Sequence, residues 1–318
     1  MMDLLKQLCA LPGVSSFEDA VRDYIKEQAA PYVDTMNVDA MGNPICFKKG
    51  AKATGTKLML CAHMDEVGLM VRSITEDGYL KFVCVGGMDR RVLLGKQMLV
   101  GDRQIPGVIG LKAIHMTTAQ ERKKVPKLED YYIDIGASSR EEAEALVEVG
   151  DRVGCAVLLE LLRRDLPMDC TFVFTVQEEV GTRGAFGAAF SVTPDIALVL
   201  EGTTAADAPS QDPEAQICHL GQGPVLSWMD KGTIYDRDLF ERLRAVAQEH
   251  NIPWQLKRYV AGSTDAKAIQ RTKSGVRVAG ISAPVRYLHA PASVLKMSDV
   301  EQVLELAWLF LQSIAGDC

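Results

Sequence analysis

The residues with the clearest capacity for chemistry are a histidine and several acids that directly follow apolar segments. His63 follows the run Leu-Met-Leu-Cys-Ala, and Asp65 lies two residues later. In an extended chain residues i and i+2 share a face, so His63 and Asp65 project together. A metal-binding histidine usually donates its second ring N–H to a carboxylate. The pair therefore fits a metal ligand with its supporting acid, although a simple hydrogen bond at a strand end explains it equally well.

A pair of adjacent acids, Glu178 and Glu179, follows the apolar segment 170–176. Adjacent carboxylates at the end of a buried strand repel each other unless a cation compensates their charges. One glutamate can then bind a metal ion while its neighbour transfers protons. A solvated acidic loop is the plain alternative, and the apolar segment upstream is what favours the metal site.

Two further candidates lie nearer the C-terminus. Glu201 ends the apolar segment 195–200, and the segment 284–291 supplies a second histidine, His289. Imidazole and carboxylate ligands without cysteine are typical of Zn, Co or Mn sites rather than of structural zinc sites. Each signal is weak alone, but together they place two histidines and several carboxylates at strand ends.

The elements that must position these residues alternate between strands and helices in two parts of the chain. Apolar strands and helices alternate before residue 67 and again from about residue 150. This alternation predicts an α/β fold with a mostly parallel sheet between layers of helices. Ligands of open α/β sheets bind at the carboxyl ends of the strands, which is where the candidate residues fall.

The middle of the chain has a different pattern. From about residue 67 to residue 135, short alternating segments are separated by glycines, which is typical of a β-barrel with little helix. A helix is expected to begin at residue 138 and to reach about residue 147. We therefore predict a catalytic α/β domain of residues 1–66 and 150–318, interrupted by a β-rich insert of residues 67–149.

The composition argues against several classes of protein. The net charge is −7 and the basic residues are scattered, so a nucleic-acid partner is not expected. No apolar run reaches about 18 residues, so no membrane span is expected. The eight cysteines form no C-x-x-C pair and the N-terminus does not resemble a signal peptide, which predicts free thiols and a cytoplasmic location.

In their order along the chain, the motifs resemble those of the glutamyl/leucyl (deblocking) aminopeptidases, which assemble as tetrahedral dodecamers. The resemblance spans the chain, and its motifs are Pro12–Ser15, Ala62–Glu66, Asp151–Gly154, Gln177–Ala185, Glu201–Thr204, Gly262–Ala266 and Arg286–His289. The fold that it implies is an α/β catalytic domain with an inserted β-barrel dimerisation domain. It also implies a homo-oligomer in which dimers form a dodecamer.

The resemblance implies an activity and a role for each candidate. It implies two divalent metal ions per subunit, Zn or Co, and a metal-bound hydroxide that removes the N-terminal residue from short peptide substrates. His63 and Glu201 become ligands of one ion, although the family often has Asp where Glu201 stands. Glu179 and His289 become ligands of the other ion. Glu178 becomes the general base, and Asp65 completes the catalytic site beside His63.

The chain departs from the family at the junction between the insert and the next helix. The family bridges its metals with an aspartate that opens an Asp-Asp-Arg or Asp-Asn-Arg turn, whereas this chain reads Gly150-Asp151-Arg152 with a single aspartate. Either further residues belong before Asp151, or the protein lacks them and binds metal poorly. The intact helix 153–162 favours the first explanation, and the intact mass distinguishes the two. Asp151 is then the neighbour of the bridging ligand or its replacement.

Two other functions are open at this point. One is a different metal-dependent hydrolase on the same scaffold, such as a deacylase, or a glycanase, as some relatives are labelled. A glycosidase with paired carboxylates would not need His63 and His289, however. The other is a catalytically inactive assembly protein, which only the altered motif at Asp151 favours. Chelator sensitivity, metal content, and hydrolysis of amino-acid anilides compared with cellulose would distinguish them.

Overall fold

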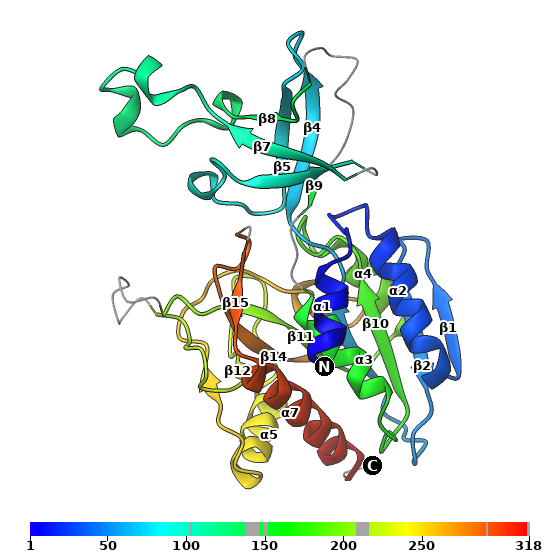
Figure 1. The fold of residues 1–318 in the computed structure, drawn as a ribbon. Coiled ribbons are helices and arrows are strands. Elements are labelled where there is room, and N and C mark those ends of the chain that lie inside the picture. The colour runs from blue at the N-terminus through cyan, green and yellow to red at the C-terminus, as the bar shows by residue number, and fades with distance from the viewer. Residues whose placement is uncertain (102–103, 138–146, 149–151, 208–215, 291, 317–318) are drawn as a thin grey trace.

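The protein consists of an α/β body with a separate barrel above it (Figure 1). The computed structural model describes residues 1–101, 104–137, 147–148, 152–207, 216–290 and 292–316. Within these residues the body contains a nine-stranded sheet in the order β1-β2-β10-β3-β11-β14-β12-β13, with β15 paired to β14. The strands are β1 (Thr35–Val38), β2 (Pro44–Lys48), β3 (Leu58–His63), β10 (Cys170–Thr175), β11 (Ile196–Thr204), β12 (Val225–Leu226), β13 (Gln255–Leu256), β14 (Arg277–Arg286) and β15 (Val294–Leu295).

The centre of this sheet is parallel. β10, β3, β11 and β14 are hydrogen-bonded neighbours that run in the same direction, while β2 and β12 flank them in the antiparallel direction. The central strands are almost continuously apolar because helices cover both of their faces. The prediction of a mostly parallel α/β sheet is therefore confirmed.

Alternation along β3 divides its side chains between two cores. Leu58 and Leu60 pack into the larger core, while Met59 and Cys61 pack into the smaller one on the other face. The larger core is covered by α1 (Met2–Cys9), α2 (Asp19–Ala29), α3 (Val153–Leu162), α5 (Arg237–Glu249) and α7 (Met297–Gly316). The smaller core is covered by α4 (Arg183–Val192) and α6 (Ala266–Gln270).

The helix α3 lies against the middle of the sheet and is buried on nearly all sides. Its close approach depends on Gly154, because a Cβ at this position would lie 2.1 Å from the carbonyl oxygen of Leu200 in β11. The short approach brings the start of α3 next to the strand ends where the candidate residues lie.

The insert forms a closed antiparallel barrel in the order β4-β5-β8-β7-β6-β9, with its own apolar core. Its strands are β4 (Gly68–Ile74), β5 (Leu80–Val85), β6 (Gln97–Val100), β7 (Ile105–Gly110), β8 (Tyr132–Asp134) and β9 (Val147–Glu148). The barrel confirms the fold predicted for this region. The helix expected from residue 138 falls largely outside the described residues, and Val147, at its expected end, belongs to β9.

Short 3₁₀ helices occupy several connections: η1 (Ala30–Tyr32), η2 (Arg90–Val92), η3 (Ile114–Met116), η4 (Glu121–Lys123) and η5 (Leu128–Asp130). Across the described parts of the chain, no helix combines the length and apolar character that crossing a lipid bilayer requires.

Arg152, directly before α3, is a buried charge that connects distant segments. Its Nε donates to the carbonyl oxygen of Met64 at 2.9 Å. Its Nη1 donates to the carbonyl oxygens of Leu8 at 3.0 Å and Leu11 at 2.8 Å. Its Nη2 lies 2.9 Å from Oε1 of Glu66, which is also buried. The guanidinium thus ties the end of α1 and the loop after β3 to the start of α3.

Replacing this charge should strongly destabilise the fold. The variant Arg152→Met removes the buried cation beside Glu66 and the donors to three carbonyl oxygens, so its free energy of unfolding should fall by about 3–5 kcal/mol in denaturant titrations. Arg163→Met is the matched control, because Arg163 and its partner Glu160 form a more exposed pair. The control should change the free energy of unfolding by less than about 1 kcal/mol. Similar stabilities of the two variants would contradict this account.

Candidate metal centre

Five of the candidate residues lie at one edge of the parallel sheet. His63 is the last residue of β3, Glu178 and Glu179 follow β10, and Glu201 lies in β11. His289 follows β14. Because β10, β3, β11 and β14 are parallel neighbours, their carboxyl ends meet at this edge. All five side chains line one cavity of about 380 Å³.

Glu201 reaches this edge in a way that the sequence did not indicate. The strand β11 continues to Thr204 rather than ending at residue 200, so Glu201 lies within a strand. Pairing of β11 with β3 stops at Val199, however, while pairing with β14 continues. Glu201 therefore lies just beyond the end of β3, beside the cavity.

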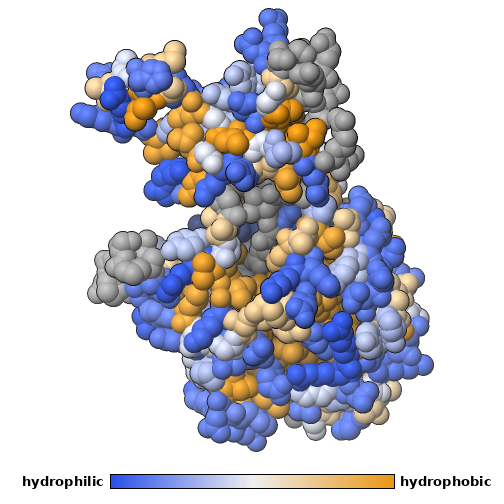
Figure 2. Space-filling view, in the orientation of Figure 1, coloured by the Kyte–Doolittle hydropathy of each residue, from blue (hydrophilic) through white to orange (hydrophobic). Residues whose placement is uncertain are grey.

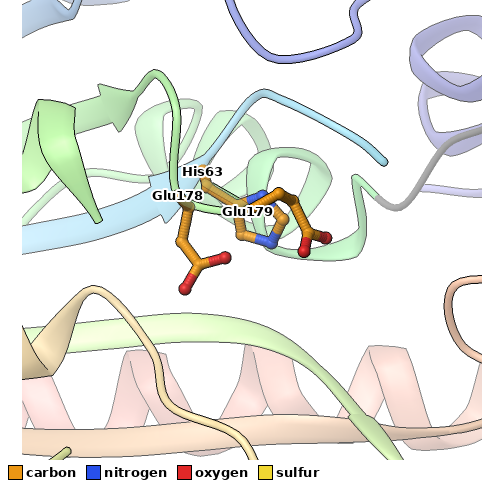
Figure 3. Close-up of side chains that lie close together, drawn as sticks. All are labelled: His63, Glu178 and Glu179. Atoms are coloured by element: carbon orange, nitrogen blue, oxygen red, sulfur yellow. The ribbon is translucent and has the colours of Figure 1, made fainter. Parts of the chain in front are cut away.

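The core of the centre is formed by His63, Glu178 and Glu179. One ligand atom from each of these residues lies within 4.8 Å of the others, and Figure 3 shows the two glutamates on either side of the imidazole. His289 joins this group, since its Nε2 lies 3.1 Å from Oε1 of Glu179. The structure thus brings together two imidazoles and two carboxylates, a donor set that suits a divalent transition metal.

Both histidines are held in the same way. Nδ1 of His63 lies 3.0 Å from the backbone oxygen of Asp65. Nδ1 of His289 lies 3.0 Å from the backbone oxygen of Gly87, which follows β5 of the barrel. Because a carbonyl oxygen can only accept, each contact places a proton on Nδ1, and Nε2 is then the nitrogen that would bind a metal ion. In the loop that carries His289, Tyr287 and His289 itself adopt left-handed backbone conformations, each with φ of 60°. Backbone strain of this kind clusters at ligand sites.

Asp65 contacts His63, as its spacing indicated, and its carboxylate also holds the loop that follows β10. Its carboxylate Oδ1 lies 3.6 Å from Nδ1 of His63, beyond good hydrogen-bond distance. The carboxylate instead accepts the backbone N–H groups of Glu178 at 2.9 Å and Glu179 at 3.1 Å. The Ser15 hydroxyl donates to it at 2.6 Å. Asp65 therefore positions the loop that carries both glutamates, while its backbone orients His63.

The electrostatics of the centre reflect several charges in a buried space. Burial raises the pKa of Glu178 well above its ordinary value, against the opposing charge of His63. Burial likewise raises the pKa of Glu201 to about 8, although Lys257 opposes this shift. Burial lowers the pKa of His63, but its acidic neighbours outweigh burial and raise that pKa well above its ordinary value. Divalent cations would relieve the cost of ionising these carboxylates.

The structure describes some of the remaining candidate residues and adds one that the sequence did not single out. Asp151, the proposed bridging position, lies outside the described residues. Gly262 to Thr264, which belong to one of the motifs, line the cavity, while Asp265 is buried and accepts a hydrogen bond from the Thr175 hydroxyl. Lys257 also lines the cavity, and nothing in the sequence distinguishes it from its neighbour Arg258.

The fold and the centre together define a class of protein. A parallel sheet with imidazoles and carboxylates at its carboxyl edge, interrupted by a β-barrel, is the architecture of metal-dependent aminopeptidases. The sequence model described as M42 glutamyl aminopeptidase matches residues 42–153 and 150–306, so the chain belongs to this family.

Individual relatives agree with this assignment. The chain is 30% identical to the lysyl aminopeptidase of Pyrococcus furiosus over 345 aligned positions, which cover 98% of this chain and 97% of that protein. It is similar to the structure of an aminopeptidase from Desulfurococcus kamchatkensis, with a TM-score of 0.91, 35% identity, and coverage of 98% and 94% of the two chains. It is also similar to the TET1 peptidase of Pyrococcus horikoshii, described as able to form a tetrahedron or a large octahedral shell, with a TM-score of 0.84, 30% identity and 98% coverage of each chain.

The comparisons also locate the junction near Asp151 at which the sequence departs from the family motif. The alignment with the Pyrococcus furiosus enzyme spans 345 positions, more than the 318 residues of this chain, so that enzyme contains residues without a counterpart here. The two ranges matched by the family model overlap at residues 150–153. The break in the match therefore lies at the junction that contains Asp151.

The role of Asp65 leads to a prediction about metal affinity. Glu178 N–H and Glu179 N–H bond to different oxygens of Asp65, and in Asp65→Asn one of these oxygens becomes an NH2 donor, so the Glu178–Glu179 loop should lose its position. The dissociation constant for Zn²⁺, measured by competition with a chromogenic chelator, should rise about 10- to 100-fold.

Asp299→Asn is the matched control for this prediction. Asp299 is also buried and accepts the backbone N–H groups of Gly221 and Gly223, but it does not line the cavity. Its replacement should lower stability and leave Zn²⁺ affinity within about threefold of the original, well short of the effect of losing a supporting residue. Equal Zn²⁺ affinities in the Asp65 variant and the original protein would contradict the positioning role.

Proposed function

We propose that the centre binds two divalent ions, Zn or Co, and that the chain uses them to remove N-terminal residues from short peptides. The observation that carries this proposal is the convergence of His63, Glu178, Glu179 and His289, with both imidazoles oriented through Nδ1. In this proposal His63 and Glu201 hold one ion, and Glu179 and His289 hold the other. Asp151 is proposed as the ligand shared between them or as its immediate neighbour.

When bound, such ions lower the pKa of a coordinated water and polarise a substrate carbonyl. Glu178 is placed to act as the general base and acid. It lines the cavity beside His63 and Glu179, and burial raises its pKa well above its ordinary value. A carboxylate with a raised pKa can accept a proton from water and return it to the departing amine near neutral pH.

The cavity also favours exopeptidase action. Its volume of about 380 Å³ accommodates the end of a peptide rather than an extended chain. The carboxylate of Glu179 lies at the sheet edge, where the free α-amine of a substrate would be attracted. A peptide whose N-terminus is blocked lacks this charge and should be a poor substrate.

We further propose that residues 67–149 form a dimerisation unit, and that dimers assemble into a dodecamer in the cytoplasm. The barrel exposes large apolar side chains: Ile114 is 71% exposed and Met116 is 63% exposed. Figure 2 shows hydrophobic residues gathered on the visible face of the barrel. The assembly described for the TET1 peptidase and the free cysteines of the described residues support this part of the proposal.

Removing the proton-transfer group should stop turnover without removing metal. In Glu178→Gln the side chain keeps its size but cannot accept a proton, so kcat on aminoacyl p-nitroanilides should fall at least about 10³-fold. Metal content, measured by plasma mass spectrometry, should match that of the original protein.

The neighbouring substitution Glu179→Gln provides the comparison. Glu179 lies beside Nε2 of His289, so its replacement should lower metal content as well as activity. Substantial anilide hydrolysis by Glu178→Gln would contradict its proposed role. Hydrolysis that is insensitive to chelators in the original protein would contradict the proposed function itself.

A further inference from the structure

The loop that carries Glu178 and Glu179 begins with an unusual backbone conformation. The strand β10 ends at Thr175, and two residues later Gln177 adopts a left-handed conformation with φ of 57°. Residues other than glycine rarely adopt this conformation, because the Cβ then crowds a carbonyl oxygen. The turn at Gln177 leads directly into Glu178 and Glu179, which lie on either side of the His63 imidazole (Figure 3). A contact that holds Gln177 therefore bears on both glutamates.

Side chains, rather than a neighbouring strand, hold this stretch of backbone. The pairing of β10 with β3 stops at Thr175, and each of the next four N–H groups donates to a side-chain oxygen. The acceptors are Asn43 for Val176 at 2.9 Å, Glu18 for Gln177 at 3.1 Å, and Asp65 for Glu178 and Glu179. All three acceptors are buried, and all three precede the barrel in the sequence. The conformation of the loop thus depends on residues that are distant from it along the chain.

Glu18 is the acceptor for the left-handed residue itself. It lies directly before α2, where a side chain that accepts hydrogen bonds often caps the helix, yet it makes no capping hydrogen bond. Its carboxylate is instead turned to the Gln177 N–H, which offsets part of the cost of burying an acidic group. Three residues earlier, the Ser15 hydroxyl donates to Asp65 at 2.6 Å. The short segment from Ser15 to Glu18 therefore supports the loop at two points.

We propose that Glu18 is a positioning residue for the proposed hydrolysis, which holds Gln177 in its left-handed conformation and thereby directs Glu178 into the cavity. This inference rests on the proposed function, because it takes Glu178 as the general base. Asp65 fixes the N–H groups of Glu178 and Glu179, and Glu18 fixes the turn that precedes them. A general base must lie within hydrogen-bond reach of the water that it deprotonates, so a small change in this turn lowers turnover.

The first test removes the acceptor. Glu18→Met keeps a similar length but cannot accept the Gln177 N–H, so kcat on aminoacyl p-nitroanilides, measured with the full-length protein at saturating Zn²⁺, should fall at least about tenfold. KM should change little, because Glu18 lies outside the cavity lining. Glu18→Gln keeps an oxygen that can accept this N–H and should retain most of the turnover. An unchanged kcat in Glu18→Met would overturn the proposal.

Asp169→Met is the matched control for the loss of a carboxylate. Asp169 directly precedes β10 and so lies at the opposite end of this strand from the cavity, where its Oδ1 accepts the backbone N–H of Gly50 at 2.9 Å. The control variant should lower stability and leave kcat near that of the original protein. An equal fall in kcat in the Glu18 and Asp169 variants would overturn the proposal, because it would reflect a general loosening of the sheet.

A second substitution isolates the contribution of backbone conformation. Glycine adopts left-handed conformations freely and alanine does not, although the two residues differ by only one methyl group. In the Glu18→Met background, Gln177→Gly should therefore restore part of the turnover, with a kcat at least about threefold above that of the same background carrying Gln177→Ala. Equal kcat values in these two double variants would overturn the proposal, because the left-handed turn would then have no bearing on catalysis.

Amide hydrogen exchange gives a readout that depends on neither metal nor turnover. In the metal-free protein, the N–H groups of Glu178 and Glu179 keep their acceptor, Asp65, in every Glu18 variant. Their exchange should become faster in Glu18→Met and stay slow in Glu18→Gln, because the loop opens more often once the Gln177 contact is lost. Unchanged exchange in Glu18→Met would overturn the proposal. If the original protein hydrolyses no anilide, the proposed function fails, and this measurement alone decides whether Glu18 positions the loop.

Discussion

The geometry of the centre depends on one buried carboxylate, that of Asp65. It accepts backbone N–H groups from Glu178 and Glu179, so the loop after β3 and the loop after β10 are joined at the point where both supply candidate ligands. Asp65 sits two residues after His63, whose Nδ1 contacts its backbone oxygen. A single residue therefore sets the relative positions of an imidazole and two carboxylates that come from different strands. This contact forms because β3 and β10 are parallel neighbours with Thr175 paired to His63.

Two further constraints hold this arrangement in place. The buried guanidinium of Arg152 connects the start of α3 to Met64 and Glu66, which flank Asp65 in the sequence. From the other side, the barrel supplies the carbonyl oxygen of Gly87 to Nδ1 of His289. The barrel is thus in direct contact with the centre, and its position bears on the orientation of one candidate ligand.

Much of the centre could be predicted from the sequence because apolar segments mark buried strands, and the residues after them fall at one sheet edge. That logic identified His63, Glu178, Glu179 and His289. It placed Glu201 at a strand end, whereas β11 continues to Thr204 and only its pairing with β3 stops earlier. The periodicity of a strand shows on which face of the sheet a residue lies. It does not show which neighbouring strand lies beside a given carboxylate.

The remaining features depend on tertiary contacts that leave little local signal. The function of Asp65 required the β3–β10 register, and the contact of His289 required the position of the barrel. Lys257 follows a two-residue strand that the alternation of longer apolar segments does not reveal. At Asp151 the sequence departs from a family motif, but this junction lies outside the described residues.

The most direct test of the central claim is anomalous X-ray diffraction from crystals of the Zn-loaded protein, recorded on both sides of the zinc absorption edge. The account predicts two anomalous peaks inside the cavity, one beside His63 and Glu201 and the other beside Glu179 and His289. A single peak would contradict the proposal of two ions. Peaks elsewhere on the protein, with none in the cavity, would contradict the metal centre as a whole.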